Sequence, residues 1–135
     1  MKKSISIAVL LLACCLLLTA CGGYRSSFKA TSMVENCNST AASMRFSTLE
    51  GTKVYTLKTA KDAETRLHYS GTLETGKATV YYDDDGEKKT LFEIGAGEEA
   101  SGAVDVAAGA KVYVIFETNE ACTGGDFSFE LKKTT

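Results

Sequence analysis

Residues 126–132 have the sequence Asp-Phe-Ser-Phe-Glu-Leu-Lys, with an apolar side chain at every second position. Successive side chains of a β-strand point to opposite faces of the sheet, so Phe127, Phe129 and Leu131 share one face and the polar residues share the other. This alternation is typical of an antiparallel sheet with one face on a core and one face in water. The stretch therefore predicts a half-buried strand near the C-terminal end of the chain.

Seven more segments upstream have a strand pattern and are separated by turns that contain glycine. They are Met44–Leu49, Lys53–Thr59, Thr65–Leu73, Lys77–Tyr82, Lys89–Ile94, Gly102–Val106 and Lys111–Thr118. In the last of these, Val112 to Phe116 is apolar on both faces, which indicates a central strand or one whose second face is covered. About eight short strands predict an all-β fold, an antiparallel β-sandwich with jelly-roll or Greek-key connections. A small closed barrel is the alternative.

A different pattern occupies the N-terminus. Lys2 and Lys3 precede an apolar run from Ile5 to Leu18, and Thr19-Ala20-Cys21 follows directly. A positive segment, a short apolar segment and small residues at a cleavage site are the parts of a secretory signal. The run is shorter than the roughly 20 residues of a membrane-spanning helix. Leu18 to Cys21 resembles the lipobox of bacterial lipoproteins.

This resemblance implies cleavage before Cys21 and covalent diacylglycerol and acyl chains, such as palmitate, on that residue. Two or three chains make a stable anchor, so we expect the protein on the extracytoplasmic face of the cell membrane or of an outer membrane. We expect no other cofactor. Residues 1–20 are then a removed signal peptide, 21–42 a lipidated N-terminus and flexible tether, and 43–135 a single sandwich domain. Gly22 to Asn36 is rich in serine, glycine and charge, as tethers are.

Removal of residues 1–20 takes away Lys2 and Lys3 and no acidic residue, so the formal net charge falls from −2 to −4. A mildly acidic domain without a basic run is a poor candidate for binding nucleic acid or anionic lipid. Membrane attachment is therefore assigned to the lipid alone.

The cysteines reduce to one informative pair. Cys14 and Cys15 lie in the removed segment and Cys21 accepts the lipid, which leaves Cys37 and Cys122. An even pair in an oxidising compartment is most simply a disulfide. Two free thiols, or a redox or metal site, are the alternatives, and a metal site would find few partners because the chain has a single histidine.

Asp83, Asp84 and Asp85, followed by Gly86, form the densest polar cluster of the chain. Asp-Gly between two alternating segments is a strong hairpin signal. Carboxylates on a short loop are also what calcium prefers, but the positions that an EF-hand loop would need at its ends are Tyr81 and Phe92. We predict a hairpin and keep calcium as the weaker alternative.

Catalytic constellations are weak. Glu98 and Glu99, with Glu93 nearby, are paired carboxylates of the kind that glycoside hydrolysis uses, but adjacent residues in a glycine-rich loop are more typical of a solvated loop. His68 and Asp105 could join a serine in a triad. No Gly-x-Ser-x-Gly motif accompanies them, and we predict that His68 is a surface residue.

Tyr55, Tyr81 and Tyr113 each stand next to a position that the alternation places on the core, so some of their rings should point outward. Tyrosine has an apolar face and a polar tip, which suits it to sugar and peptide binding. The alternative is that these rings pair across strands and cover the sheet.

The sequence therefore predicts a non-catalytic binding or accessory module on the cell surface, with an envelope glycan or protein as partner and no nucleic acid. The exported part is similar to small β-sandwich lipoproteins, without a specific functional family. In size and architecture it is also similar to lysozyme-inhibitor lipoproteins, so an envelope inhibitor is the alternative. A hydrolase is less favoured.

Overall fold

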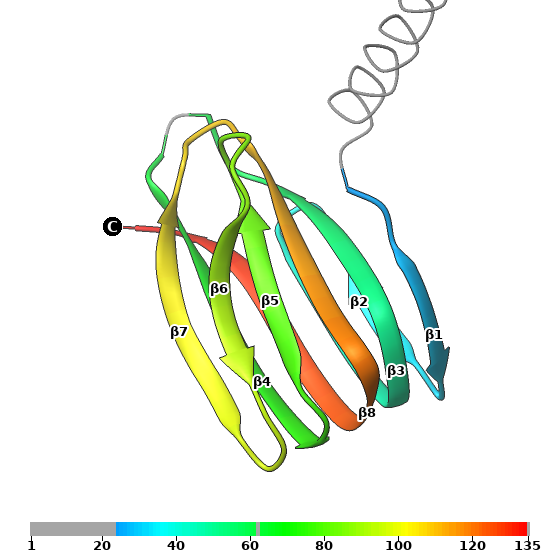
Figure 1. The fold of residues 1–135 in the computed structure, drawn as a ribbon. Coiled ribbons are helices and arrows are strands. Elements are labelled where there is room, and N and C mark those ends of the chain that lie inside the picture. Colours follow the sequence, from blue (N-terminus) through cyan, green and yellow to red (C-terminus); the bar gives the residue numbers. More distant parts are fainter. Residues whose placement is uncertain (1–23, 62, 135) are drawn as a thin grey trace, which may run out of the picture.

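The computed structural model describes residues 24–61 and 63–134. Cys21 and the signal segment lie outside these residues. The strands are β1 (Ser27–Thr31), β2 (Val34–Cys37), β3 (Ala41–Lys58), β4 (Thr65–Thr75), β5 (Ala78–Asp83), β6 (Lys89–Ile94), β7 (Glu99–Val106) and β8 (Lys111–Lys133), and their pairings are antiparallel (Figure 1). Within the described part, no helix is both long and apolar enough to cross a membrane.

Two long strands build both layers of a sandwich. β3 has 18 residues and β8 has 23, and each bends midway, so that its two halves belong to opposite layers (Figure 1). The first half of β3 and the second half of β8 join β2, β4 and β7 in what we call the β4 layer. The other halves join β5 and β6 in the β5 layer.

Gly51 sits where β3 bends. The register of β3 on β8 shifts between Leu49 and Gly51, and Gly51 has φ of 117°. A Cβ atom at this position would lie 2.3 Å from the carbonyl oxygen of Ser27. Only glycine fits such a backbone next to a neighbouring strand. The sequence pattern predicts two separate strands, one on each side of this glycine, whereas the structure has one continuous strand with a bulge.

Aromatic rings from both layers fill the core. Phe127 of the β4 layer packs edge to face against Phe116 of the β5 layer, with ring centroids 4.9 Å apart. It also stacks near Phe92, which in turn stacks on Tyr69 at 4.8 Å. Phe127, Phe129 and Leu131 are buried while Ser128 and Glu130 are exposed. The alternation predicted for residues 126–132 is therefore confirmed.

The all-β sandwich of eight strands is confirmed as the fold class. The main strand path runs from β1 at one edge to β7 at the other, and the sheet is not closed into a barrel. The barrel alternative is therefore wrong.

The predicted tether is partly wrong. β1 and β2 pair along the edge of β3, so residues 27–37 belong to the sandwich. Their side chains are mostly exposed. They join the sheet mainly through backbone hydrogen bonds, and within these two strands only Ala30 packs against the core, so the hydrophobic pattern of the sequence does not reveal them.

The predicted disulfide between Cys37 and Cys122 is also wrong. Cys37 pairs with Ala42 and Cys122 pairs with Leu49, seven residues further along β3. At about 3.3 Å per residue this separates the two cysteines by roughly 23 Å, whereas a disulfide needs Cα atoms within about 7 Å. Both thiols are free, with Cys37 exposed and Cys122 buried.

We therefore expect a maleimide reagent to modify Cys37 in the native protein and to modify Cys122 only after unfolding. Mass spectrometry after native and denaturing labelling measures this directly. A protein that takes no label until a reductant is added would contradict the assignment of free thiols.

Candidate functional site

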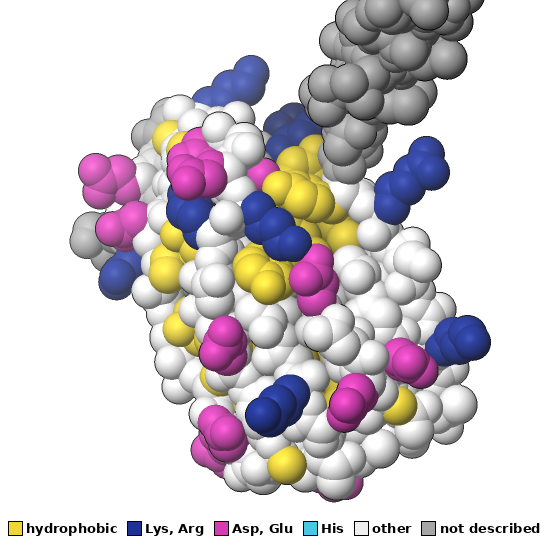
Figure 2. Space-filling view, in the orientation of Figure 1, with side chains coloured by type: hydrophobic (Ala, Val, Ile, Leu, Met, Phe, Trp, Pro, Cys, Tyr) yellow, Lys and Arg dark blue, Asp and Glu magenta, His cyan; other side chains and the backbone are white. Residues whose placement is uncertain are grey.

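The outer face of the β5 layer carries the densest group of exposed and half-buried aromatic side chains. Tyr81 pairs with Ile115, and Tyr113 pairs with Asp83 in the next outward-facing row of the sheet. Figure 2 shows apolar side chains gathered on this face among lysines and carboxylates. Ile115 is only 1% exposed although it points away from the core. The sequence predicts a central strand or one whose second face is covered. This half of β8 is central, because it pairs with both β3 and β5, and its outward-facing Ile115 is covered, so the prediction is confirmed.

Tyr24 is part of this outer face and holds the N-terminal segment against it. Its hydroxyl donates a hydrogen bond of 2.6 Å to Asp83 Oδ2, and its ring meets that of Tyr113 edge to face at 5.2 Å. Burial and the hydrogen bond to Asp83 raise the pKa of Tyr24 to about 12. Sequence reasoning missed this residue because it precedes the first strand pattern.

The tyrosine pKa has a consequence for stability at high pH. Because the pKa of Tyr24 rises from 10.0 to about 12 on folding, its contribution to stability is complete below pH 10 and is lost as the pH rises toward 12. We expect Tyr24→Phe to be less stable at neutral pH and to lose less further stability over this interval than the wild type. Urea denaturation at pH 8 and at pH 11.5 measures both. Equal losses for the two proteins would contradict the role of Tyr24.

Tyr55 does not belong to the outer face. It is 4% exposed, lies on the core side with Leu57, and donates a 2.8 Å hydrogen bond to Glu35 Oε2. Lys53 Nζ lies 3.1 Å from the same carboxylate oxygen. Burial, and then the Glu35 contact, raise the pKa of Tyr55. The prediction that its ring faces outward is wrong. In this half of β3 the alternation places Tyr55 and Leu57 on the core face, and the neighbouring Val54 lies on the other face.

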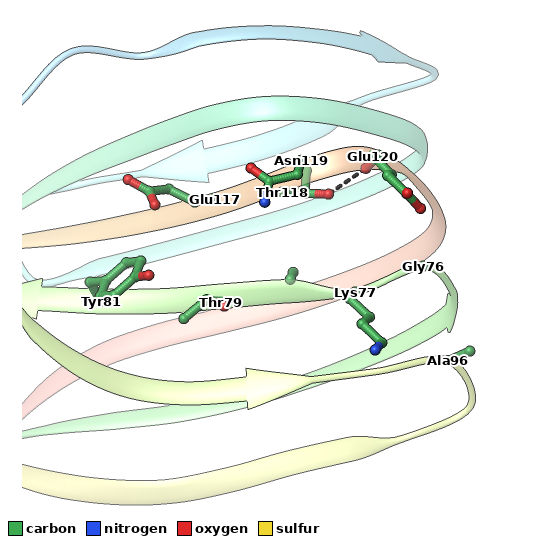
Figure 3. A pocket seen from close by; sticks show the side chains of 10 residues that line it. Gly76, Lys77, Thr79, Tyr81, Ala96, Glu117, Thr118, Asn119 and Glu120 are labelled. Atoms are coloured by element: carbon green, nitrogen blue, oxygen red, sulfur yellow. Dashed lines mark hydrogen bonds between the residues drawn. The ribbon is translucent and has the colours of Figure 1, made fainter.

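An open groove lies beside Tyr81, over β5 and the neighbouring part of β8. Its volume is about 640 Å³. Lys77, Thr79 and Tyr81 line it from one strand, and Glu117, Asn119 and Glu120 line it from the other (Figure 3). Thr79 and Glu117 are register partners on neighbouring strands, so their side chains lie next to each other on the same face of the sheet. We call this the β5–β8 groove.

Neighbouring contacts fix the polar side chains of the groove. Lys88 Nζ lies 4.1 Å from the centroid of the Tyr81 ring and 2.8 Å from Glu117 Oε1. The buried Thr118 hydroxyl donates to the carbonyl of Glu120 (Figure 3). The lysine thus connects the aromatic wall to the carboxylate on the neighbouring strand, and the threonine contact holds the bend of β8 that carries Glu120.

A second hollow of about 400 Å³ extends the β5–β8 groove. It shares Lys77 and Thr79 with it and continues to Glu93 and Glu98 on the far side of β5. The hollowed surface therefore crosses three strands, β8, β5 and β6. Glu93 and Glu98, two of the weak candidates for catalytic carboxylates in the sequence, both lie at this extension.

The aspartate cluster forms the predicted hairpin between β5 and β6. Asp83 Oδ1 accepts the Gly86 amide at 2.7 Å, and Asp84 Oδ2 accepts the Ala107 amide at 2.8 Å. Lys89 Nζ lies 2.9 Å from Asp84 and 3.4 Å from Asp85. Burial raises the pKa of Asp84, but the contacts with Lys89 and Ala107 outweigh it and lower the pKa. Within the described residues no group of three acidic, histidine or cysteine side chains is arranged for a metal, so the calcium alternative gains no support.

His68 lies away from the β5–β8 groove, on the outer face of the β4 layer. Its register partners are Ala103 and Glu130. Asp105, the candidate partner for a triad, instead accepts a 3.1 Å contact from Arg66 Nε. The described contacts therefore do not bring His68 and Asp105 together.

No protein-family model matches the chain, and neither does the sequence of any curated protein. Similar solved structures include TmCBM61 in complex with beta-1,4-galactotriose, at 14% identity over 82% of this chain and 88% of that chain, with a TM-score of 0.48. The pre-peptidase C-terminal domain of collagenase from Bacillus anthracis has 14% identity over 79% and 89%, with a TM-score of 0.44. A mutant carbohydrate-binding module of family 29 has 16% identity over 81% of each chain, with a TM-score of 0.40. Likenesses this distant carry no ligand or activity over to this chain.

Proposed function

We propose that the protein is a non-catalytic, lipid-anchored binding module of the cell surface and that its β5–β8 groove holds a glycan. The observation that carries this proposal is the placement of one aromatic wall, Tyr81, among polar side chains on a rigid sheet. The groove volume of about 640 Å³ falls within the range of roughly 300–1,000 Å³ that small-ligand sites occupy.

The chemistry of the groove suits a sugar better than a wholly apolar ligand. A pyranose ring presents C–H groups on its faces and hydroxyls around its edge. Tyr81 offers an apolar surface with a polar tip, while the Glu117 and Glu120 carboxylates accept hydrogen bonds and the Asn119 amide both donates and accepts them. Apolar contact with a few convergent polar groups is the usual composition of a ligand site.

Placement on strands also supports binding rather than turnover. Tyr81 and Glu117 lie on neighbouring strands, and Lys88 contacts both. Sites built on a rigid sheet keep their geometry when a ligand arrives. Because Glu117 is held in an ion pair, we assign it to accepting hydrogen bonds from hydroxyl groups and not to proton transfer.

The binding proposal is tested by presenting the mature protein, solubilised in detergent, to an array of envelope, plant and host oligosaccharides. We expect retention on a set of glycans that share one backbone linkage, and no shorter products after incubation. Retention on no glycan would overturn the proposal, and release of cleaved sugar would overturn its non-catalytic part.

The lipid anchor rests on Leu18 to Cys21. In a bacterial host, we expect Cys21→Ser to leave the protein unacylated and outside the detergent phase of a Triton X-114 partition. Mass spectrometry of the N-terminal peptide measures acylation independently. A Cys21→Ser protein that is still processed and still membrane-bound would contradict the anchor.

A further inference from the structure

The two ends of the sandwich are built from different parts of the chain. Because β3 and β8 both fold over, their four ends meet, and Lys58 N donates to Ser39 O while Leu131 N donates to Thr40 O. We call this the terminal end; it consists of 38–40, 58–61, 63–65, 83–89, 106–111 and 131–134. The opposite end, the groove end, consists of 31–34, 49–51, 73–78, 94–99 and 118–123.

The two ends differ in charge. The groove end carries one exposed lysine, Lys77, and five exposed carboxylates: Glu50, Glu74, Glu98, Glu99 and Glu120. The exposed charged side chains described at the terminal end are Lys58, Lys61, Lys111, Lys132, Lys133, Glu64, Asp85 and Glu87. Lys88 also starts from this end, but its ammonium lies at Glu117 and the Tyr81 ring of the groove. The sequence adds Asp62 between Lys61 and Ala63. The fold thus places most exposed lysines at one end of an acidic protein.

The N-terminal segment reaches the sandwich close to the terminal end. Tyr24 is fixed by Asp83, the last residue of β5, and by Tyr113, two residues from the start of β8. Cys21 precedes Tyr24 by three residues, which span at most about 11 Å when extended. A lipid on Cys21 would therefore enter the membrane beside the terminal end. β4, whose 11 residues measure about 35 Å, separates this end from the groove end.

We infer that the terminal end rests on the membrane, with its lysines against anionic lipid headgroups, and that the β5–β8 groove points away from the bilayer. The inference depends on the lipid anchor of the proposed function. Lysines within a Debye length of about 8–10 Å are attracted to an anionic leaflet, and the carboxylates of the groove end are repelled by it. Charge and anchor position therefore favour the same orientation.

The orientation is measured by energy transfer from a single fluorophore to acceptor-labelled lipids in nanodiscs that carry the acylated protein. In a Cys37→Ser background, one variant carries Ala108→Cys in the exposed β7–β8 turn and the other carries Ala121→Cys in the exposed bend of β8. Cys122 is buried, so we expect it to take no label in the native state. In anionic nanodiscs we expect severalfold greater transfer from position 108 than from position 121.

The charge contribution is tested with Lys58→Glu/Lys111→Glu at the terminal end and with the matched pair Lys29→Glu/Arg45→Glu, whose exposed side chains lie outside both ends. We expect the first pair to reduce the difference in transfer in anionic nanodiscs and the second pair to leave it unchanged. The lysine contact would be overturned if the difference in transfer between positions 108 and 121 persisted in both double variants and had the same size in zwitterionic nanodiscs.

The two proposals fail in distinguishable ways. Equal transfer from positions 108 and 121, with the acyl mass present on Cys21, would overturn the orientation and leave the anchor intact. An unmodified Cys21 in the protein purified from membranes would overturn the anchor, and the orientation with it.

Discussion

Replacement of Phe127 by alanine is expected to lower the free energy of unfolding by about 3–5 kcal/mol, the usual cost of removing a large aromatic side chain from a core. Phe127 is fully buried and lies between the two layers, where it packs against Phe116 and stacks near Phe46 and Phe92. Its ring also covers Gly71 on the neighbouring strand, where a Cβ atom would lie 2.3 Å from it. The cavity left by alanine would therefore open against backbone as well as side chains.

Urea denaturation at neutral pH measures this loss. If the free energy of unfolding falls with urea concentration at the same slope in the variant and the wild type, the surface exposed on unfolding is the same in both. Phe28→Ala is the matched control. Its ring is 37% exposed at the edge strand β1 and contacts the Lys53 ammonium at 5.1 Å, so we expect a loss of about 1 kcal/mol. Similar losses for the two variants would contradict the position of Phe127 at the centre of the core.

Replacement of Tyr81 by alanine is expected to weaken glycan binding by at least about tenfold, or ~1.4 kcal/mol. The substitution removes the aromatic wall of the β5–β8 groove and frees Lys88 from the ring. Aromatic contacts contribute about 0.5–1.5 kcal/mol beyond the area that they bury. Tyr81 is half-buried on the outer face, so its loss should leave the core and the fold intact.

Calorimetric titration with a glycan selected on the array measures this effect, and circular dichroism checks the fold. Tyr113→Ala is the control, because Tyr113 shares the outer face but contacts Tyr24 instead of lining the groove. We expect the Tyr113→Ala variant to bind the glycan with the affinity of the wild type. Loss of binding in the Tyr113 variant with retention in the Tyr81 variant would move the site to the other end of this face.

The local parts of the fold could be predicted from the sequence. Lys89–Ile94 is a strand with the predicted bounds, because the Asp-Gly turn ends on one side of it and Gly95 follows on the other. The continuity of β3 and β8 could not be predicted. Glycine usually interrupts strands, yet Gly51 forms a bulge within β3, and Gly125 within β8 leaves room for the Phe46 ring, which lies 2.2 Å from where a Cβ atom would stand.

The candidate site could be predicted only in part. The alternation indicates an outward Tyr81 and Tyr113, and the structure places both on the outer face of the β5 layer. The groove itself depends on the pairing of residues 79–83 with 113–117, a non-local register that periodicity does not contain. The charge difference between the two ends has the same origin, since a net charge cannot indicate which residues the fold brings together.

Chemical-shift mapping of the backbone amides during titration with the bound glycan locates the ligand residue by residue. With the glycan in the β5–β8 groove, the largest shift changes fall at residues 76–81 and 117–120. Largest changes at His68, Ser101 and Ser128, on the outer face of the β4 layer, would contradict the groove as the binding site.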